Sequence, residues 1–274
     1  MQAVTEPVST TRSSSTTPVL EIKDLHAWYG ESHILHGVNL TVNKGEVVSL
    51  LGRNGAGRTT TLRAIMGLTG KRRGSIRING EETIRMPTYR IAHMGVGYCP
   101  EERGIFASLS CEENLYLPPR VRSKQPQPPM HTKEIYEMFP NLERRKNSPG
   151  TRLSGGEQQM LAVARILHTG ANLLLLDEIS EGLAPVIVQA LARMITMLKE
   201  KGYTVVMVEQ NFHFAAPLAD RMYVMEHGEI IEQFSSDQLQ EKMPVLNQLL
   251  TVSNNPQVME AYMGTTAGEL QGAH

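Results

Sequence analysis

One segment limits the possible folds of this chain more than any other, the glycine-rich loop at residues 52–59. It reads Gly-Arg-Asn-Gly-Ala-Gly-Arg-Thr, which fits the pattern G-x-x-x-x-G-[K/R]-T with arginine where lysine is usual. The apolar residues 47–51 before it predict a buried strand, and residues 59–67 after it predict a helix that ends at Gly67. In this order, backbone N–H groups and a helix N-terminus form a cradle for a phosphate group. The loop therefore predicts an α/β fold with a phosphate site at the end of a strand.

Further apolar segments extend this strand into a sheet. In residues 172–176 and 204–208 every residue after the first is apolar, which predicts buried strands, and between them residues 186–201 predict an amphipathic helix that ends at Gly202. Strand, helix and strand in succession favour parallel pairing. Residues 223–231 predict a hairpin at the end of the sheet.

Composition along the chain predicts the domain boundaries. Residues 1–18 are rich in Ser and Thr and poor in large apolar side chains, so we expect a loose tail, and residues 254–274 receive no fold. Residues 19–253 should form one α/β domain with a mixed, mainly parallel sheet. Within it, short strands and glycine-marked turns at residues 19–80, with the phosphate loop and its helix inserted, fit a mixed sheet, and residues 85–167 predict an inserted helical subdomain.

Charge and composition exclude several classes of protein. The formal net charge is −1, which gives no overall positive field for nucleic acid. No run of eighteen apolar residues and no signal pattern is present, so we expect a cytoplasmic chain that does not itself span a membrane. Cys99 and Cys111 lack metal-ligand spacing and fit structural or incidental thiols.

Asp177 and Glu178 directly follow the predicted strand 172–176, which ends in four leucines. Ligands bind at the carboxyl edge of a parallel sheet, which is where both carboxylates should lie. Beside a phosphate loop, the first acid would hold Mg²⁺ together with the hydroxyl of Thr59, and the second would act as general base on an attacking water. A solvated acidic pair is the plain alternative, but it does not explain why the pair follows a phosphate loop and a buried strand.

Residues 153–160 read Leu-Ser-Gly-Gly-Glu-Gln-Gln-Met. Ser154 and Glu157 have the spacing of a capping box at a helix N-terminus. Gly155 and Gly156 each cost about 1 kcal/mol of helix propensity, which a cap alone does not require. They would suit a phosphate that approaches the backbone. A second phosphate-binding helix end suggests a nucleotide held between two subunits.

With these three motifs in this order, residues 20–234 resemble the ATP-binding subunit of an ABC transporter. The resemblance implies a P-loop NTPase core with an antiparallel β subdomain and an inserted helical subdomain. It also implies head-to-tail dimers, in which ATP lies between the phosphate loop of one subunit and residues 154–157 of the other. Tyr29 matches the aromatic position that stacks on adenine, although a buried aromatic at a strand end remains the alternative. The implied ATP contacts are Tyr29, Gly52, Arg53, Asn54, Gly55, Ala56, Gly57, Arg58, Thr59, Thr60, Glu101, Ser154, Gly155, Gly156 and Glu157.

Finer features are similar to the smaller ATPase subunit of branched-chain amino acid importers. Glu101 takes the position of a glutamine that senses Mg²⁺, Gln210 takes that of the switch histidine, and residues 180–185 and Asn114 fit the same branch. The implied partners are hydrophobic permease subunits, a second identical or homologous ATPase subunit and, indirectly, a periplasmic binding protein. The implied location is the cytoplasmic face of a bacterial inner membrane. Because glutamine carries no proton, Glu178 would be the only base.

Two departures from the family pattern bear on catalysis. Ile179 replaces the proline usual after Asp-Glu, and Arg58 replaces lysine. Arginine is longer, planar and forked, so the exchange is not conservative. ATP binding should survive, whereas a displacement of about 1 Å can cost on the order of 100-fold in rate. A regulatory subunit with little hydrolysis, the ATPase of a urea or amide importer, and a soluble ABC ATPase of translation, repair or chromosome maintenance remain alternatives.

Overall fold

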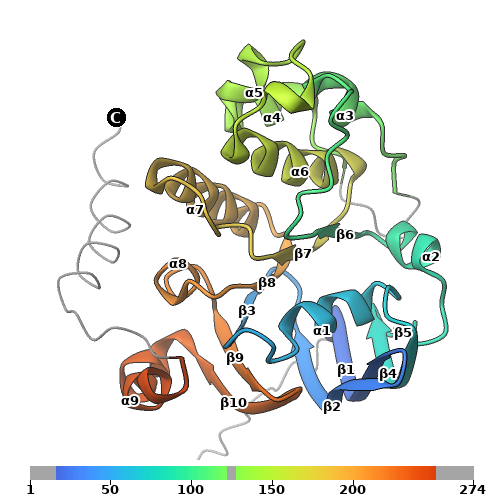
Figure 1. The fold of residues 1–274 in the computed structure, drawn as a ribbon, viewed down its shortest axis with the longest axis vertical. Coiled ribbons are helices and arrows are strands. Elements are labelled where there is room, and N and C mark those ends of the chain that lie inside the picture. The colour runs from blue at the N-terminus through green and yellow to red at the C-terminus, as the bar shows by residue number, and fades with distance from the viewer. Residues whose placement is uncertain (1–16, 122–127, 251–274) are drawn as a thin grey trace, which may run out of the picture.

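The computed structural model describes residues 17–121 and 128–250, and this part of the chain forms two sheets with helices around them (Figure 1). The larger sheet has the strand order β10–β9–β3–β8–β7–β6. Its strands are β3 Val47–Gly52, β6 Val96–Cys99, β7 Leu173–Asp177, β8 Thr204–Val208, β9 Arg221–Glu226 and β10 Glu229–Ser235. All neighbours pair in parallel except β9 and β10, which form an antiparallel hairpin. The predicted α/β fold with a mixed, mainly parallel sheet is therefore confirmed.

Both faces of the larger sheet are buried. In β3, Val47 and Leu51 pack into one hydrophobic cluster, while Val48 and Leu50 pack into another. Successive side chains of a strand point to opposite faces, so the two clusters lie on opposite sides of the sheet. This arrangement explains why the apolar runs are continuous rather than alternating.

The smaller sheet is antiparallel and has the order β2–β1–β4–β5. Its strands are β1 Leu20–Tyr29, β2 Ser32–Val42, β4 Lys71–Ile78 and β5 Glu81–Glu82. Helix α1, Arg58–Ile65, contributes Leu62 and Ile65 to the hydrophobic cluster that joins this sheet to the larger one. The helix after the phosphate loop is thus fixed between two sheets (Figure 1).

A group of helices covers the β6 end of the larger sheet (Figure 1). It consists of α3 Cys111–Tyr116, α4 Thr132–Met138, α5 Pro140–Arg144, the short 3₁₀ helix η1 Gly150–Arg152, and α6 Gly155–Thr169; α2, Thr88–His93, precedes β6. The range 85–167 given above to the helical subdomain includes β6, which belongs to the larger sheet, so the helical part of the structure begins at α3. Gly97 of β6 permits close packing of α6, since a Cβ there would lie 1.9 Å from Ile166 Cγ2.

The remaining helices follow the later strands. They are α7 Pro185–Glu200, α8 Phe212–Ala215, the 3₁₀ helix η2 Ser236–Gln238, and α9 Leu239–Leu250. The predicted helix at residues 186–201 is confirmed by α7, whereas α9 was not predicted. The predicted N-terminal tail, apart from residues 17 and 18, and the tail at 254–274 lie outside the described residues.

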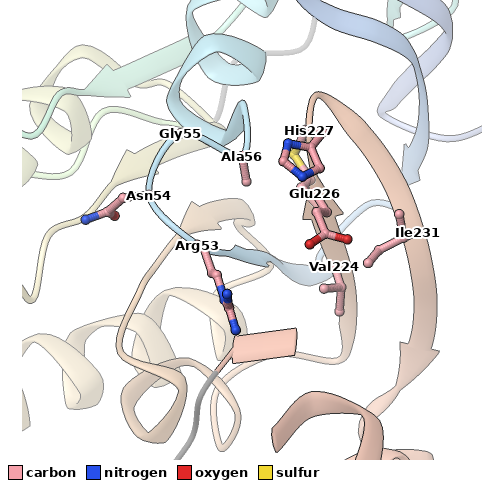
Figure 2. Close-up of a pocket in the computed structure, with 9 residues that line it drawn as sticks. Arg53, Asn54, Gly55, Ala56, Val224, Glu226, His227 and Ile231 are labelled. Atoms are coloured by element: carbon pink, nitrogen blue, oxygen red, sulfur yellow. The ribbon is translucent and has the colours of Figure 1, made fainter. Parts of the chain in front are cut away.

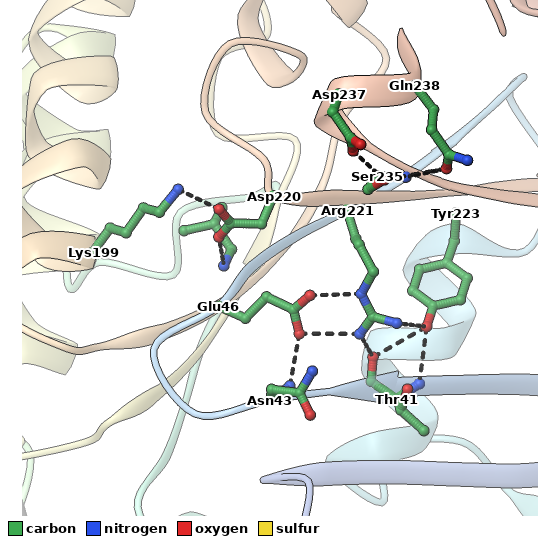
Figure 3. Close-up of polar contacts among 11 residues, drawn as sticks. Thr41, Asn43, Glu46, Lys199, Asp220, Arg221, Tyr223, Ser235, Asp237 and Gln238 are labelled. Carbon is green, nitrogen blue, oxygen red and sulfur yellow. Dashed lines mark hydrogen bonds and ion pairs between the residues drawn. The ribbon is translucent and has the colours of Figure 1, made fainter. Parts of the chain in front are cut away.

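A polar network joins the edge of the smaller sheet to β9 (Figure 3). Arg221 donates from Nε to Glu46 Oε1 at 2.6 Å and from Nη2 to Glu46 Oε2 at 3.0 Å. The Tyr223 hydroxyl donates to the carbonyl of Thr41, in β2, at 3.1 Å. A forked guanidinium that holds both carboxylate oxygens fixes geometry as well as charge. The network therefore helps to hold the two sheets in one orientation.

Both cysteines are free and buried, so we expect them to resist alkylation in the native chain. Burial raises the pKa of Cys99 to about 12 and that of Cys111 to about 11, which removes the reactive thiolate. Treatment with iodoacetamide at pH 8 should modify neither thiol until denaturant is added, as followed by mass spectrometry. Rapid native labelling of either thiol would contradict its burial.

Candidate nucleotide site

The phosphate loop takes its shape from glycine conformations and from a distant hairpin. Gly55 and Gly57 have φ of 81° and 104°, values that side chains disfavour, and a Cβ at Gly57 would also lie 2.8 Å from Leu35 Cδ2. The N–H of Gly228, in the β9–β10 turn, donates to the carbonyl of Ala56 at 2.9 Å. Figure 2 shows the small cavity between this loop and the turn, lined by Arg53, Ala56 and Glu226 among others. The β9–β10 turn thus supports the phosphate loop.

Arg58 forms an ion pair with the predicted general base. Its Nη2 donates to Glu178 Oε1 at 2.9 Å and to Asn54 Oδ1 at 3.3 Å. The Arg58 side chain is 4% exposed and that of Glu178 is 11% exposed. Nη1 of Arg58 is buried without a hydrogen-bond partner, which suits an anion that has still to bind. In this conformation the Arg58 guanidinium, which is expected to bind phosphate, is paired with the Glu178 carboxylate, which is expected to act on water.

Glu178 lies immediately after β7 in a left-handed conformation, with φ of 48°. Its N–H donates to the carbonyl of Val208, at the end of β8, at 2.8 Å. Burial raises the pKa of Glu178 to about 7, with a further rise from Glu181 and an opposing effect of the Arg58 charge. A carboxyl with a pKa near neutrality is suited to accept a proton during catalysis.

Thr59 and Asp177 form an oxygen pair that fits a magnesium ion. Thr59 Oγ1 donates to Asp177 Oδ1 at 2.9 Å, and the Tyr98 hydroxyl donates to Oδ2 at 3.0 Å. Neighbouring ligands of an octahedral Mg²⁺ at 2.0–2.1 Å are about 3 Å apart, so this spacing is suitable. Burial raises the pKa of Asp177, and a bound cation would favour its charged form.

The surroundings of this pair are also typical of magnesium with a nucleotide. Among residues 17–121 and 128–250, no three His, Cys, Asp or Glu side chains cluster as metal ligands. Mg²⁺ in nucleotide sites uses one or two protein oxygens and takes the others from phosphates and water. The two oxygens of Thr59 and Asp177 meet that requirement.

The other predicted site residues lie around this centre. Glu101 is exposed in the turn after β6, close enough to Asp177 to influence its pKa. Gln210 is exposed after β8, where it lines a cavity with Glu181 and Glu209. Tyr29, at the end of β1, is 38% exposed rather than buried. Its adenine contact stays a prediction.

The N-terminus of α6 contains the predicted capping box. Ser154 N–H donates to Glu157 Oε2 at 2.8 Å, and Glu157 N–H donates to Ser154 Oγ at 3.3 Å. The structure also gives the two glycines a role apart from phosphate. A Cβ at Gly156 would lie 2.8 Å from both Ile187 Cγ atoms, and one at Gly155 would lie 3.2 Å from the guanidinium of Arg103. Packing against α7, which the sequence did not indicate, therefore contributes to the choice of glycine at residue 156.

Gly156→Ala is expected to destabilise the chain more than Gly155→Ala. The added methyl must displace the branched Ile187, whereas at residue 155 it meets the movable end of Arg103. Overpacking of this kind costs about 1–3 kcal/mol. Denaturant unfolding of both variants, without nucleotide, measures the difference, and equal stabilities would contradict the packing argument.

Asn114 holds the loop between β6 and α3. Its Nδ2 donates to the carbonyls of Phe106, Leu109 and Ser110, and its Oδ1 accepts from the N–H of Phe106 at 2.7 Å. The side chain is fully buried, so these bonds satisfy it where water is excluded. The residue noted above as a branch feature thus has a structural role here.

The family model described as ABC transporter matches residues 35–181, a range that contains the phosphate loop, the α6 N-terminus and both acids. The chain belongs to this family. Its predicted membership is confirmed.

Relatives of this ABC cassette differ in their stated cargo. The high-affinity branched-chain amino acid transport ATP-binding protein BraG of Pseudomonas aeruginosa is 39% identical over 90% of this chain and 100% of its own length. The lipopolysaccharide export system ATP-binding protein LptB of Haemophilus influenzae is 32% identical over 90% of this chain and 97% of its own. A bacterial ABC transporter cassette solved as a dimer has a TM-score of 0.69 and 25% identity, covering 79% of this chain and 98% of that one. None of the described helices of our ABC cassette is both long and apolar enough to cross a membrane.

Proposed function

We propose that the chain is the ATP-hydrolysing subunit of an ABC importer. The observation that carries this proposal is the meeting of three parts: the phosphate loop at Arg58, the oxygen pair of Thr59 and Asp177, and the Glu178 carboxylate. They lie after β3 and at the end of β7, two parallel strands that β8 separates in the larger sheet. Membership of the ABC family supports the reaction, since the family binds and hydrolyses ATP.

In this proposal each group of residues has a separate role in ATP binding or hydrolysis. Backbone N–H groups of the loop and the Arg58 guanidinium bind the phosphates, and Thr59 and Asp177 hold Mg²⁺. Magnesium supplies charge neutralisation on the phosphate oxygens. Glu178 accepts the proton of the attacking water once its pair with Arg58 opens, and Gln210 hydrogen-bonds the terminal phosphate. Ser154 and Gly155 of a second copy, or of a homologous subunit, complete the site from the opposite side.

The second candidate function is that of a nucleotide-binding regulatory subunit that hydrolyses little ATP. One contact in the structure favours it. Arg58 Nη2 and Glu178 Oε1 are 2.9 Å apart, so the proposed phosphate-binding cation and the proposed base are paired with each other. A chain that keeps this pair when ATP is bound would act as a nucleotide-binding regulatory subunit. Exchange of Arg58 for lysine separates the two candidates, as described below.

The proposed cargo is branched-chain amino acids, at the cytoplasmic face of a bacterial inner membrane. The supporting observation is the 39% identity to the BraG protein over its whole length. An ATPase subunit does not touch cargo, so the assignment rests on that likeness, and a urea or amide importer is the alternative. Uptake of labelled leucine, isoleucine and urea by cells with and without the gene tests it. Loss of urea uptake alone would overturn it.

Association with permease subunits is a separate part of the proposal. Phe106, in the loop between β6 and α3, and Leu117, directly after α3, are 47% and 49% exposed, which suits contact with a partner. Tagged chain purified from detergent extracts should bring down polytopic membrane proteins, and Phe106→Asp should reduce their yield. An extract in which no polytopic protein accompanies the unaltered chain would refute the transport role.

A further inference from the structure

Glu209 is a buried acid that the proposed reaction does not use. It is 1% exposed and lies at the carboxyl end of β8, one residue before Gln210. Its two oxygens accept from one residue, with Ser180 Oγ donating to Oε2 at 2.7 Å and Ser180 N–H donating to Oε1 at 3.3 Å. A buried carboxyl with both oxygens committed to a single loop residue acts as an anchor for that loop.

The anchored loop is the one that carries Glu178. Ser180 lies two residues after it, and the intervening Ile179 is buried. Glu178 itself has φ of 48°, a conformation that a non-glycine residue keeps only when its surroundings impose it. Ile179 has no ring that fixes its own φ, so the contacts of the loop must supply the restraint.

The end of β8 holds this loop on both sides of Ile179. Before it, the N–H of Glu178 donates to the carbonyl of Val208 at 2.8 Å. After it, Ser180 is held by Glu209, the next residue of the same strand end. Val208, at the end of β8, and Glu209, directly after it, thus hold the loop at Glu178 and at Ser180.

We propose that Glu209 is a positioning residue, which through Ser180 keeps the Glu178 carboxylate in the orientation required for hydrolysis. The proposal rests on the proposed function, because Glu178 is the base in that reaction. In this role Glu209 would act on Glu178 through Ser180 and not by contact with phosphate or water. It acts by restraining residues 178–180 against the end of β8.

Three variants of the full-length chain test this role. Glu209→Ala removes the anchor, and Ser180→Ala removes the shorter bond with little change in volume. Glu209→Gln is the conservative variant, because its amide can accept from the Ser180 N–H and donate to Oγ. Burial raises the pKa of Glu209 to about 8, so an uncharged side chain matches the native one over much of the neutral range.

Kinetics give the first readout. A displacement of about 1 Å costs on the order of 100-fold, so kcat should fall about 10- to 100-fold in Glu209→Ala and about 3- to 10-fold in Ser180→Ala. The dissociation constant for ATP, measured with EDTA to prevent turnover, should change less than about threefold, since the phosphate loop is intact. Glu209→Gln should keep kcat within about threefold.

Hydrogen exchange gives a readout that does not depend on turnover. Amides of residues 178–183 should exchange several-fold faster in Glu209→Ala and Ser180→Ala than in the native chain, while those of the phosphate loop stay unchanged. Thr83→Val is the matched control, since it removes another buried hydroxyl bond, from Thr83 Oγ1 to the Ile76 carbonyl at 3.0 Å in the smaller sheet. It should change neither kcat nor the exchange of residues 178–183.

The two readouts separate failure of this proposal from failure of the proposed function. Native exchange and native kcat in Glu209→Ala would overturn the positioning role. If the unaltered chain does not hydrolyse ATP, the proposed function fails, and the exchange of residues 178–183 still decides whether Glu209 holds the loop. ATP affinity and kcat could instead fall together in every variant, including Glu209→Gln. That result would indicate a folding defect and would also refute the positioning role.

Discussion

Glu178→Gln is expected to lower ATP turnover by about 100- to 10,000-fold, the range that general bases contribute. The glutamine keeps the size of the side chain and can still accept a hydrogen bond from Arg58, but it cannot take a proton from water. Gln210 cannot replace it, because its side chain is also an amide. Phosphate release at saturating Mg-ATP measures the effect.

ATP binding by Glu178→Gln should be retained, and its ATP-bound dimer should persist longer because hydrolysis no longer ends it. Size-exclusion chromatography with ATP and Mg²⁺ follows the dimer. Glu200→Gln, an exposed carboxylate at the end of α7, is the control and should behave as the native chain. Native turnover in Glu178→Gln would remove Glu178 from the role of base.

Arg58→Lys is expected to raise kcat about tenfold. The guanidinium fork holds Glu178 and Asn54 at once and leaves Nη1 for phosphate, so arginine can keep the base paired while ATP is bound. A lysine has one nitrogen, which phosphate would draw away from Glu178. Release of the carboxylate restores a free base, and the KM for ATP should change little.

Arg58→Ala separates binding from rate at the same residue. Loss of a charged hydrogen bond costs about 1.5–3 kcal/mol, so the dissociation constant for ATP should rise about 10- to 100-fold. Arg90→Lys, at an exposed position of α2, is the control for the exchange of arginine for lysine. Equal turnover in the native chain and Arg58→Lys would show that arginine is accommodated and would contradict the inhibitory pair.

The sequence predicted the parts of the site whose chemistry is local. Glycines at 55 and 57, the capping residues 154 and 157, and the acids that end β7 each have a spacing with one strong physical interpretation, and the structure contains the corresponding loop, cap and strand end. The continuous leucines of β7 predicted a strand with two buried faces, because a strand that is covered on both sides has no polar side chains between its apolar ones.

Contacts between distant segments could not be predicted in this way. The Arg58–Glu178 pair, the Ser180–Glu209 anchor and the packing of Gly156 on Ile187 each join residues whose sequence neighbours do not indicate the partner. Helix α9 was missed because Pro244 lies inside it and interrupts the usual pattern. The boundary at residue 85 was placed too early to separate β6 from the helices, because a four-residue strand between loops leaves a weak periodic signal.

The position of β3 in the larger sheet has a consequence for synthesis of the chain. Its two neighbours are β8 and β9, so residues 47–52 have no sheet partner until residues 204–226 have left the ribosome. The bond from Gly228 to Ala56, which supports the phosphate loop, forms later still. Such non-local pairing makes folding slow, and nascent chains expose their unpaired strands until it is complete. The nucleotide pocket is therefore a late product of folding, although its first residues are among the earliest translated.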